Sequence, residues 1–117
     1  CVVTGVYFKL RKADKEEIKA KMDDFMGRRR DKQPLEYPSA GSTFKRPEGN
    51  FAGALIEQCG LKGTSVGGAE VSTKHAGFVI NKGGATCRDV LDLCQKVADT
   101  VKAEKGVALE MEVRVTK

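Results

Sequence analysis

The sequence predicts a two-layer α+β domain, with helices packed on one face of a mixed or antiparallel sheet. Its 117 residues suffice for one hydrophobic core and not for two. Apolar residues alternate in some segments and recur at helical spacing in others, which predicts the order β-α-(loop)-α-β-β-α-β. We therefore expect a single domain over residues 1–117.

The first predicted elements are a strand over residues 2–10 and a helix that begins at Asp14. The strand follows from the spacing of four apolar residues: Val3, Val6, Phe8 and Leu10. Glu17 stands three residues after Asp14, as in a capping box, and Pro34 ends the helix. Four apolar residues at helical spacing are expected to form its buried stripe: Ile18, Met22, Phe25 and Met26.

A long loop and a short helix follow. The loop runs from Pro34 to Asn50, with a short extended piece expected over residues 43–45. Asn50 is a residue type that caps helices, so it predicts a helix over residues 51–59 that ends at Gly60.

The remaining elements are two strands, a helix and a closing strand. Strands are expected over residues 69–72 and 77–80, with a turn between them and the last helix. Thr86 begins that helix, and Gly106 ends it. Its apolar stripe has five members: Val90, Leu93, Cys94, Val97 and Val101.

The closing strand is expected over residues 108–115. Alternation places Glu110, Glu112 and Arg114 on one of its faces. The opposite face is apolar and consists of Met111, Val113 and Val115. Taken alone, three charged residues on one face are typical of a solvated edge.

Composition excludes several classes of protein. No apolar run is long enough to span a membrane. The four cysteines have neither zinc-site nor dithiol spacing, which favours reduced thiols, no metal site and a cytosolic protein. The net charge is +5, and a basic run at 28–32 fits a phosphate site or a solvated helix end. Few aromatic residues and no nucleic-acid motif argue against nucleic acid as the partner.

Three polar residues are candidates for chemistry. Ser42 directly follows Gly41 in a loop that two prolines stiffen, so its hydroxyl is held in place. His75, the sole histidine, lies between glycine-rich stretches, and Glu112 lies near the C-terminus. Each alone is typical of a structural residue. A Ser-His-Asp hydrolase is disfavoured because the G-x-S-x-G motif is missing.

Six segments, taken together, resemble a known family in order and spacing. They are RDKQP (30–34), PSAGSTFKRP (38–47), GNFAG (49–53), GGAEVSTKHAGF (67–78), IN (80–81) and LEMEVR (109–114). The chain resembles the C-terminal, substrate-binding domain of UDP-N-acetylenolpyruvoylglucosamine reductase (MurB), in the variant that lacks the extra tyrosine loop. The resemblance covers nearly the whole chain and implies that the family's flavin-binding domains are missing from it.

The resemblance implies an oxidoreductase of peptidoglycan synthesis. The complete enzyme passes hydride from NADPH through FAD to UDP-N-acetylglucosamine enolpyruvate, giving UDP-N-acetylmuramate. This chain is expected to bind the substrate and to need the flavin-binding domains as partners, because the flavin is held elsewhere. Alone it is expected to bind neither cofactor and to be inactive.

The resemblance also assigns residues. Ser42 matches the family's proton donor, and Glu112 matches the carboxylate that polarises the substrate carboxylate. Five residues are expected to contact substrate: Lys32 near the diphosphate, Lys45, Arg46 where other members have asparagine, His75 where some have glutamine, and Arg114.

One alternative belongs to another class of protein. The chain could be a free-standing module that binds an anionic nucleotide-sugar or RNA through Lys32, Lys45 and Arg46. A structural domain without a site of its own is the third possibility.

Overall fold

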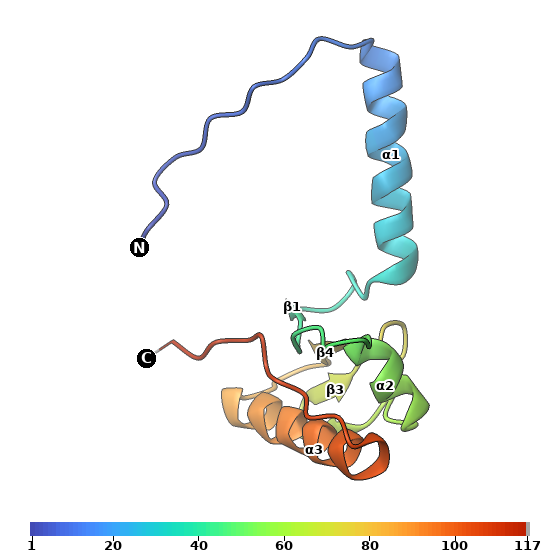
Figure 1. Cartoon of the computed structure of the whole chain (residues 1–117), viewed down its shortest axis with the longest axis vertical. Coiled ribbons are helices and arrows are strands. Elements are labelled where there is room, and N and C mark those ends of the chain that lie inside the picture. Colours follow the sequence, from blue (N-terminus) through green and yellow to red (C-terminus); the bar gives the residue numbers. More distant parts are fainter. Residues whose placement is uncertain (117) are drawn as a thin grey trace. The chain divides into compact units, whose positions relative to one another are not determined.

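The computed structural model describes residues 1–116, which divide into two compact units. The first unit is Cys1–Asp31, and the second begins at Lys32. Figure 1 traces the chain from the N-terminus in blue to the C-terminus in red.

The first unit is an irregular segment followed by one long helix. Residues 1–14 form no strand, so the strand predicted over residues 2–10 is wrong. An extended segment becomes a strand only when another strand accepts its hydrogen bonds. No described residue pairs with this segment, whose apolar side chains are exposed, for example Val3 (75%) and Phe8 (79%).

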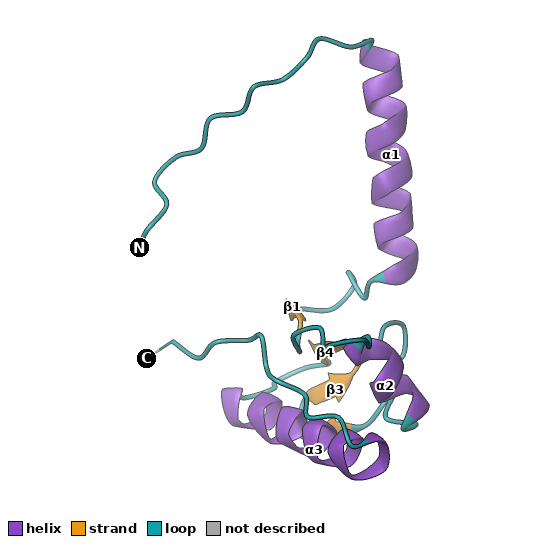
Figure 2. Cartoon of the chain, viewed as in Figure 1, coloured by secondary structure: helices purple, strands orange, loops and turns teal. Residues whose placement is uncertain are grey.

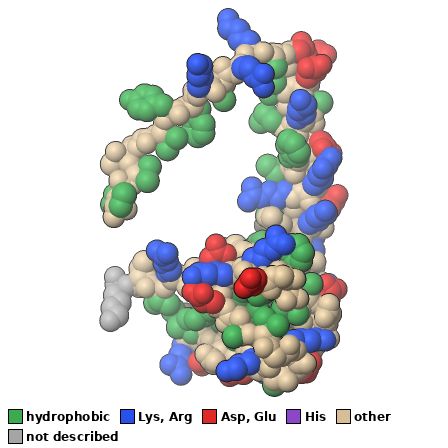
Figure 3. All heavy atoms as spheres, viewed as in Figure 1, with side chains coloured by type: hydrophobic (Ala, Val, Ile, Leu, Met, Phe, Trp, Pro, Cys, Tyr) green, Lys and Arg blue, Asp and Glu red, His purple; other side chains and the backbone are tan. Residues whose placement is uncertain are grey.

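Helix α1 (Lys15–Lys32), of which all but the last residue belongs to this unit, begins as predicted. The Asp14 carboxylate accepts hydrogen bonds from the backbone N–H groups of Glu16 (3.0 Å) and Glu17 (3.1 Å). The helix ends before Pro34, which confirms that boundary. Its apolar stripe is not buried, because all four members are at least 44% exposed: Ile18, Met22, Phe25 and Met26. Figure 3 shows apolar side chains (green) along the surface of this unit.

The second unit contains a four-stranded antiparallel sheet, which confirms the α+β class. The strand order is β1 (Ser39–Ser42), β4 (Phe78–Asn81), β3 (Ala69–Val71) and β2 (Ser65–Val66). Strands β3 and β4 match the predicted pair to within one residue at each of their ends. Strand β2 was not predicted, and β1 precedes the extended piece expected at 43–45.

Two helices complete this unit (Figure 2), α2 (Ala52–Gln58) and α3 (Cys87–Lys105). Helix α3 packs on β2, β3 and α2. The core is one cluster in which Leu93 and Val101 of α3 meet Ile56 of α2 and Val71 of β3, each at most 1% exposed. This core holds α2 and α3 against the sheet.

The ends of the two helices test the predicted caps. Thr86 and Asp89 form a capping box at the start of α3, and Gly106 ends that helix with φ 68°, as predicted. At α2 the prediction is wrong, because Phe51 occupies the N-cap and makes no side-chain capping bond. The Asn50 amide donates instead to the Glu48 carbonyl (3.2 Å), within its own loop.

The prediction of a closing strand over residues 108–115 is also wrong. This segment makes a single antiparallel bridge, between Phe44 and Met111. Two backbone hydrogen bonds flank the bridge: Lys45 N–H to Glu110 O (2.8 Å) and Glu112 N–H to Thr43 O (2.9 Å). The contact stops there because β1 ends at Ser42, so the segment has only a short length of extended chain to pair with. Its apolar face stays partly open, with Val115 57% exposed.

Candidate functional site

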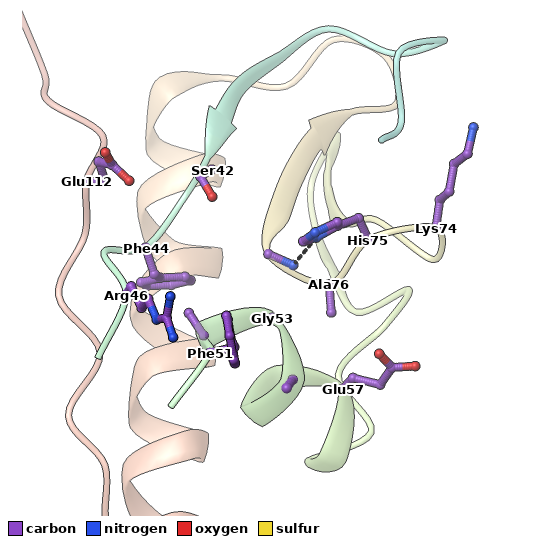
Figure 4. A pocket seen from close by; sticks show the side chains of 13 residues that line it. Ser42, Phe44, Arg46, Phe51, Gly53, Glu57, Lys74, His75, Ala76 and Glu112 are labelled. Atoms are coloured by element: carbon purple, nitrogen blue, oxygen red, sulfur yellow. Dashed lines mark hydrogen bonds between the residues drawn. The ribbon is translucent and has the colours of Figure 1, made fainter. Parts of the chain in front are cut away.

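A cavity of about 470 Å³ brings the two candidate catalytic residues together. Ser42, at the end of β1, and Glu112, in the C-terminal segment, both line it (Figure 4). The start of α2 and the loop over residues 74–77 form the rest of its wall. Arg46 and His75 also border this space, so four of the seven predicted site residues share one cavity.

A β-bulge directs Ser42. Ser39 pairs with Ile80 and Ser42 pairs with Phe78, so β1 has one more residue than β4 between these two pairs. Gly41, within the bulge, has φ 82°, which a side chain would make costly. An extra residue reverses the face on which the next side chain lies, and bulges often aim a side chain at a site in this way.

Thr43 ties Ser42 to Glu112. Its side chain is 2% exposed, and its backbone N–H donates to Gly77 O (2.9 Å). Its hydroxyl accepts from Val79 N–H (3.0 Å), while its carbonyl accepts from Glu112 N–H (2.9 Å). The residue after the serine thus anchors both β4 and the C-terminal segment. Sequence reasoning gave Thr43 no role, because these partners are distant in the chain.

His75 is held with one ring nitrogen already occupied. The Gly77 N–H donates to Nδ1 (3.1 Å), and the ring meets Phe78 edge-on with centroids 4.9 Å apart. Nδ1 accepts this bond only when it carries no proton, so the neutral ring bears its proton on Nε2. The imidazole therefore offers one N–H donor at the cavity, as a glutamine amide would.

Gly53 lets α2 approach this histidine closely. A Cβ added there would lie 3.3 Å from both His75 Cε1 and the backbone nitrogen of Gly77. Such contacts are tighter than ordinary van der Waals packing, so a larger residue would displace the ring or the loop. Gly53 belongs to the GNFAG segment, and nothing local in the sequence indicates this contact.

Arg46 lies against an aromatic ring at the cavity. Its guanidinium carbon is 4.0 Å from the centroid of Phe51, a distance typical of a cation–π contact. Lys74, which the sequence did not single out, also lines the cavity, and its ammonium lies 3.5 Å from a Glu36 carboxylate oxygen.

The remaining three candidates do not line the cavity. The Lys45 ammonium forms a salt bridge with Glu110, which lies on the same backbone bridge. Arg114 is exposed, two residues beyond Glu112. Lys32 is the exposed last residue of α1.

The described chain offers no metal cluster and no membrane span. Among residues 1–116 no three His, Cys, Asp or Glu side chains gather as a metal ion would require. The helices in that range are too short or too polar to cross a bilayer. Burial raises the pKa of the Cys94 thiol, so it stays protonated and is a poor nucleophile.

Comparison with known proteins identifies the family. Residues 33–116 match the sequence model of the C-terminal domain of UDP-N-acetylenolpyruvoylglucosamine reductase. The chain belongs to this family. The match confirms the resemblance inferred from the six segments, and it favours an enzyme domain over a free-standing anion-binding module.

Individual relatives agree with this membership in the MurB family. The reductase of Clostridium novyi is 61% identical over 97% of the chain, and that of Geobacillus kaustophilus is 57% identical over the same share. The crystal structure of MurB from Thermus caldophilus has 39% identity and a TM-score of 0.73 over 91% of the chain. The chain spans only 37–38% of the length of these proteins.

Proposed function

We propose that the chain is the substrate-binding and proton-donating part of a flavin-dependent UDP-N-acetylmuramate dehydrogenase. One observation carries the proposal: Ser42 and Glu112, from opposite ends of the second unit, line the same cavity. The relatives named as UDP-N-acetylenolpyruvoylglucosamine reductases support it. The substrate is UDP-N-acetylglucosamine enolpyruvate, and the enzyme is expected to work in the cytoplasm.

We further propose that residues 1–117 form one MurB-like domain whose partners are the flavin-binding domains of a longer chain. The relatives have ample length beyond the match to hold them. The residues that line this cavity include no G-x-G-x-x-G turn of the kind that takes a dinucleotide diphosphate, so FAD is not assigned to it. FAD and NADPH supply hydride to the enolpyruvyl double bond when bound, and they are assigned to those other domains.

Ser42 is proposed to protonate the substrate. Reduction of the double bond leaves carbanion or enol character beside the substrate carboxylate, which needs a proton on one face. A hydroxyl is a weak acid, so neighbouring positive charge must favour its transient alkoxide. Arg46 brings such charge to the same cavity. The bulge at Gly41 keeps the hydroxyl on the side where the proton is needed.

Glu112 is proposed to contact the substrate carboxylate. In its protonated form it donates a hydrogen bond to the developing enolate and lowers the barrier to its formation. Its backbone N–H is bonded to Thr43 O (2.9 Å), so the carboxyl group is tied to the residue next to Ser42. This hydrogen bond keeps the Glu112 carboxyl group and the Ser42 hydroxyl group close to the same part of the cavity.

The cations are proposed to bind the rest of the substrate. Arg46 and the Nε2–H of His75 contact the substrate inside the cavity, where both residues lie. Lys32, Lys45 and Arg114 are proposed to contact the diphosphate or the flavin side from outside it. For Lys45 this requires release from Glu110.

The serine is tested in the full-length enzyme by rapid-mixing spectroscopy of the flavin. Ser42→Ala should leave flavin reduction by NADPH unchanged and slow reoxidation by the enolpyruvyl substrate at least about 100-fold. Ser65→Ala is the matched control, because Ser65 is an exposed serine of β2 that does not line the cavity. Normal reoxidation in Ser42→Ala would show that Ser42 is not the acid. The isolated chain with FAD and NADPH should show no turnover.

A further inference from the structure

Phe51 occupies an unusual position for its residue type. It is 61% exposed, so burial in the core does not explain it. It is also the N-cap of α2, a position that favours serine, threonine, aspartate or asparagine because their side chains can accept a backbone N–H. Phenylalanine has no acceptor, and this helix has no side-chain capping bond. Neither packing nor capping therefore accounts for the ring.

The contact that does involve the ring is with Arg46. The guanidinium carbon lies 4.0 Å from the ring centroid, and both residues line the cavity (Figure 4). A ring against the guanidinium attracts the charge through its π face without using an acceptor atom. The contact thus orients the arginine and leaves donors free for an anion.

Arg46 is also the cavity's cation without a carboxylate partner. Among the described residues, no acidic side chain lies within ion-pair distance of it, whereas Lys74 is paired with Glu36. Glu57, an acidic residue of the cavity wall, is paired with Lys62 (2.6 Å). The positive charge of Arg46 is therefore available to a ligand.

The backbone on each side of the pair is fixed. Lys45 N–H donates to Glu110 O (2.8 Å), immediately before Arg46. Phe51 directly precedes α2, whose Leu55 and Ile56 are buried. The entropic cost of binding an anion therefore comes mainly from the long side chain of Arg46, which loses rotamer freedom when it binds. A stacked guanidinium has lost part of that freedom before the ligand arrives.

We propose that Phe51 is a positioning residue that holds Arg46 for the diphosphate of the nucleotide-sugar substrate. The inference rests on the proposed function and adds a specific role to a residue outside the chemistry at Ser42. It requires that Phe51 affect binding of the anion and not the proton-transfer step.

The test compares Phe51→Leu, Phe51→Tyr and Arg46→Met in the full-length enzyme. Phe51→Leu keeps an apolar side chain without a π face, and it should raise the KM for the enolpyruvyl substrate about 2- to 5-fold with kcat unchanged. Phe51→Tyr restores the ring and should stay within about twofold of wild type. Arg46→Met should raise the KM further, because it removes the charge itself.

The double variant separates positioning from a structural role. If Phe51 acts through Arg46, adding Phe51→Leu to Arg46→Met should cause no further rise in KM. A rise as large as in the wild-type background would overturn the inference, as would an unchanged KM in Phe51→Leu alone.

Calorimetry with UDP distinguishes this inference from the proposed function. The Kd for UDP should rise in Phe51→Leu by the same factor as the KM, and this rise should disappear in the Arg46→Met background. An enzyme that binds UDP in this pattern but does not reduce the enolpyruvyl substrate would refute the proposed reaction and support the role of Phe51. An unchanged Kd in Phe51→Leu would refute that role, whatever the reaction.

Discussion

Helices α1 and α3 differ in what their apolar stripes contact, although their lengths are nearly equal. They have 18 and 19 residues, and both begin at an oxygen-bearing side chain that accepts backbone N–H groups. Helix α3 buries Leu93, Cys94, Val97 and Val101, whereas α1 buries no residue.

The comparison shows that a hydrophobic pattern predicts a face and does not name its partner. Apolar residues recur at helical spacing in both helices, and in both the helix forms. Burial depends on a second surface of matching shape, which the sheet and α2 provide for α3. The two sequences also differ, because α1 is much more polar than α3 and is barely amphipathic over its full length, whereas α3 is clearly amphipathic.

The largest expected difference concerns one apolar residue from each stripe. Leu93→Ala should lower the free energy of unfolding by about 2–5 kcal/mol, because Leu93 is fully buried. Met22→Ala should change it by less than about 0.5 kcal/mol, because Met22 is 65% exposed. Urea unfolding followed by circular dichroism measures both. Equal losses would mean that the stripe of α1 is packed in solution.

A glycine from each unit should respond to alanine with opposite signs. Gly41→Ala in the bulge should destabilise the second unit by about 1–2 kcal/mol, since φ is 82° there. Gly27→Ala in α1 should favour the helix by about 1 kcal/mol, because nothing lies within 4 Å of the added methyl group. Thermal unfolding monitors the first change, and helix content monitors the second. A Gly41→Ala protein as stable as wild type would argue against the bulge.

Loss of the α3 cap should lower the stability of the whole second unit, whereas loss of the α1 cap should lower the stability of α1 alone. Thr86→Ala should lower global stability by about 1 kcal/mol, because the capping box belongs to a packed helix. Asp14→Ala removes the acceptor for two N–H groups and should weaken only α1. Amide hydrogen exchange separates these cases, with faster exchange confined to residues 15–32 in Asp14→Ala. Faster exchange throughout the sheet in that variant would contradict the comparison.

The smallest effect is expected from the pH dependence of the α3 cap. The Thr86 backbone N–H, the Thr86 hydroxyl and the Gly68 N–H lower the pKa of Asp89 below its ordinary 3.8. A lowered pKa in the folded state means that ionised Asp89 favours folding above that ordinary value. The contribution is lost as the pH falls through the lowered pKa. Asp89→Asn should therefore flatten the acid limb of the stability profile below about pH 4. An unchanged limb would exclude this carboxylate as a cause.

The elements that sequence predicts well are those whose signals are local. For α3, the cap, the stripe and the terminating glycine all lie within the helix or beside it. The strand over residues 2–10 and the closing strand were wrong because a strand requires a partner elsewhere in the chain. The bulge in β1 could not be predicted, since it is defined by a register against β4.

For the site, the residue types could be named but not their assembly. The resemblance supplied Ser42 and Glu112, and the structure places both at one cavity. Thr43 and Gly53 were missed because their contacts join distant segments. Phe51 was missed because Asn50, a residue type that caps helices, placed the predicted cap one residue earlier, and only the structure shows the aromatic residue at the N-cap.

Two backbone hydrogen bonds, one donated by Lys45 and one by Glu112, attach the C-terminal segment near the cavity. They join residues that are far apart in the chain, since Lys45 and Glu110 are separated by 65 positions. On the ribosome, the sheet and α2 are complete before Glu112 has been synthesised. A nascent chain at that stage presents the serine hydroxyl without its carboxyl partner. The cavity wall closes only when the segment that carries Glu112 emerges and docks.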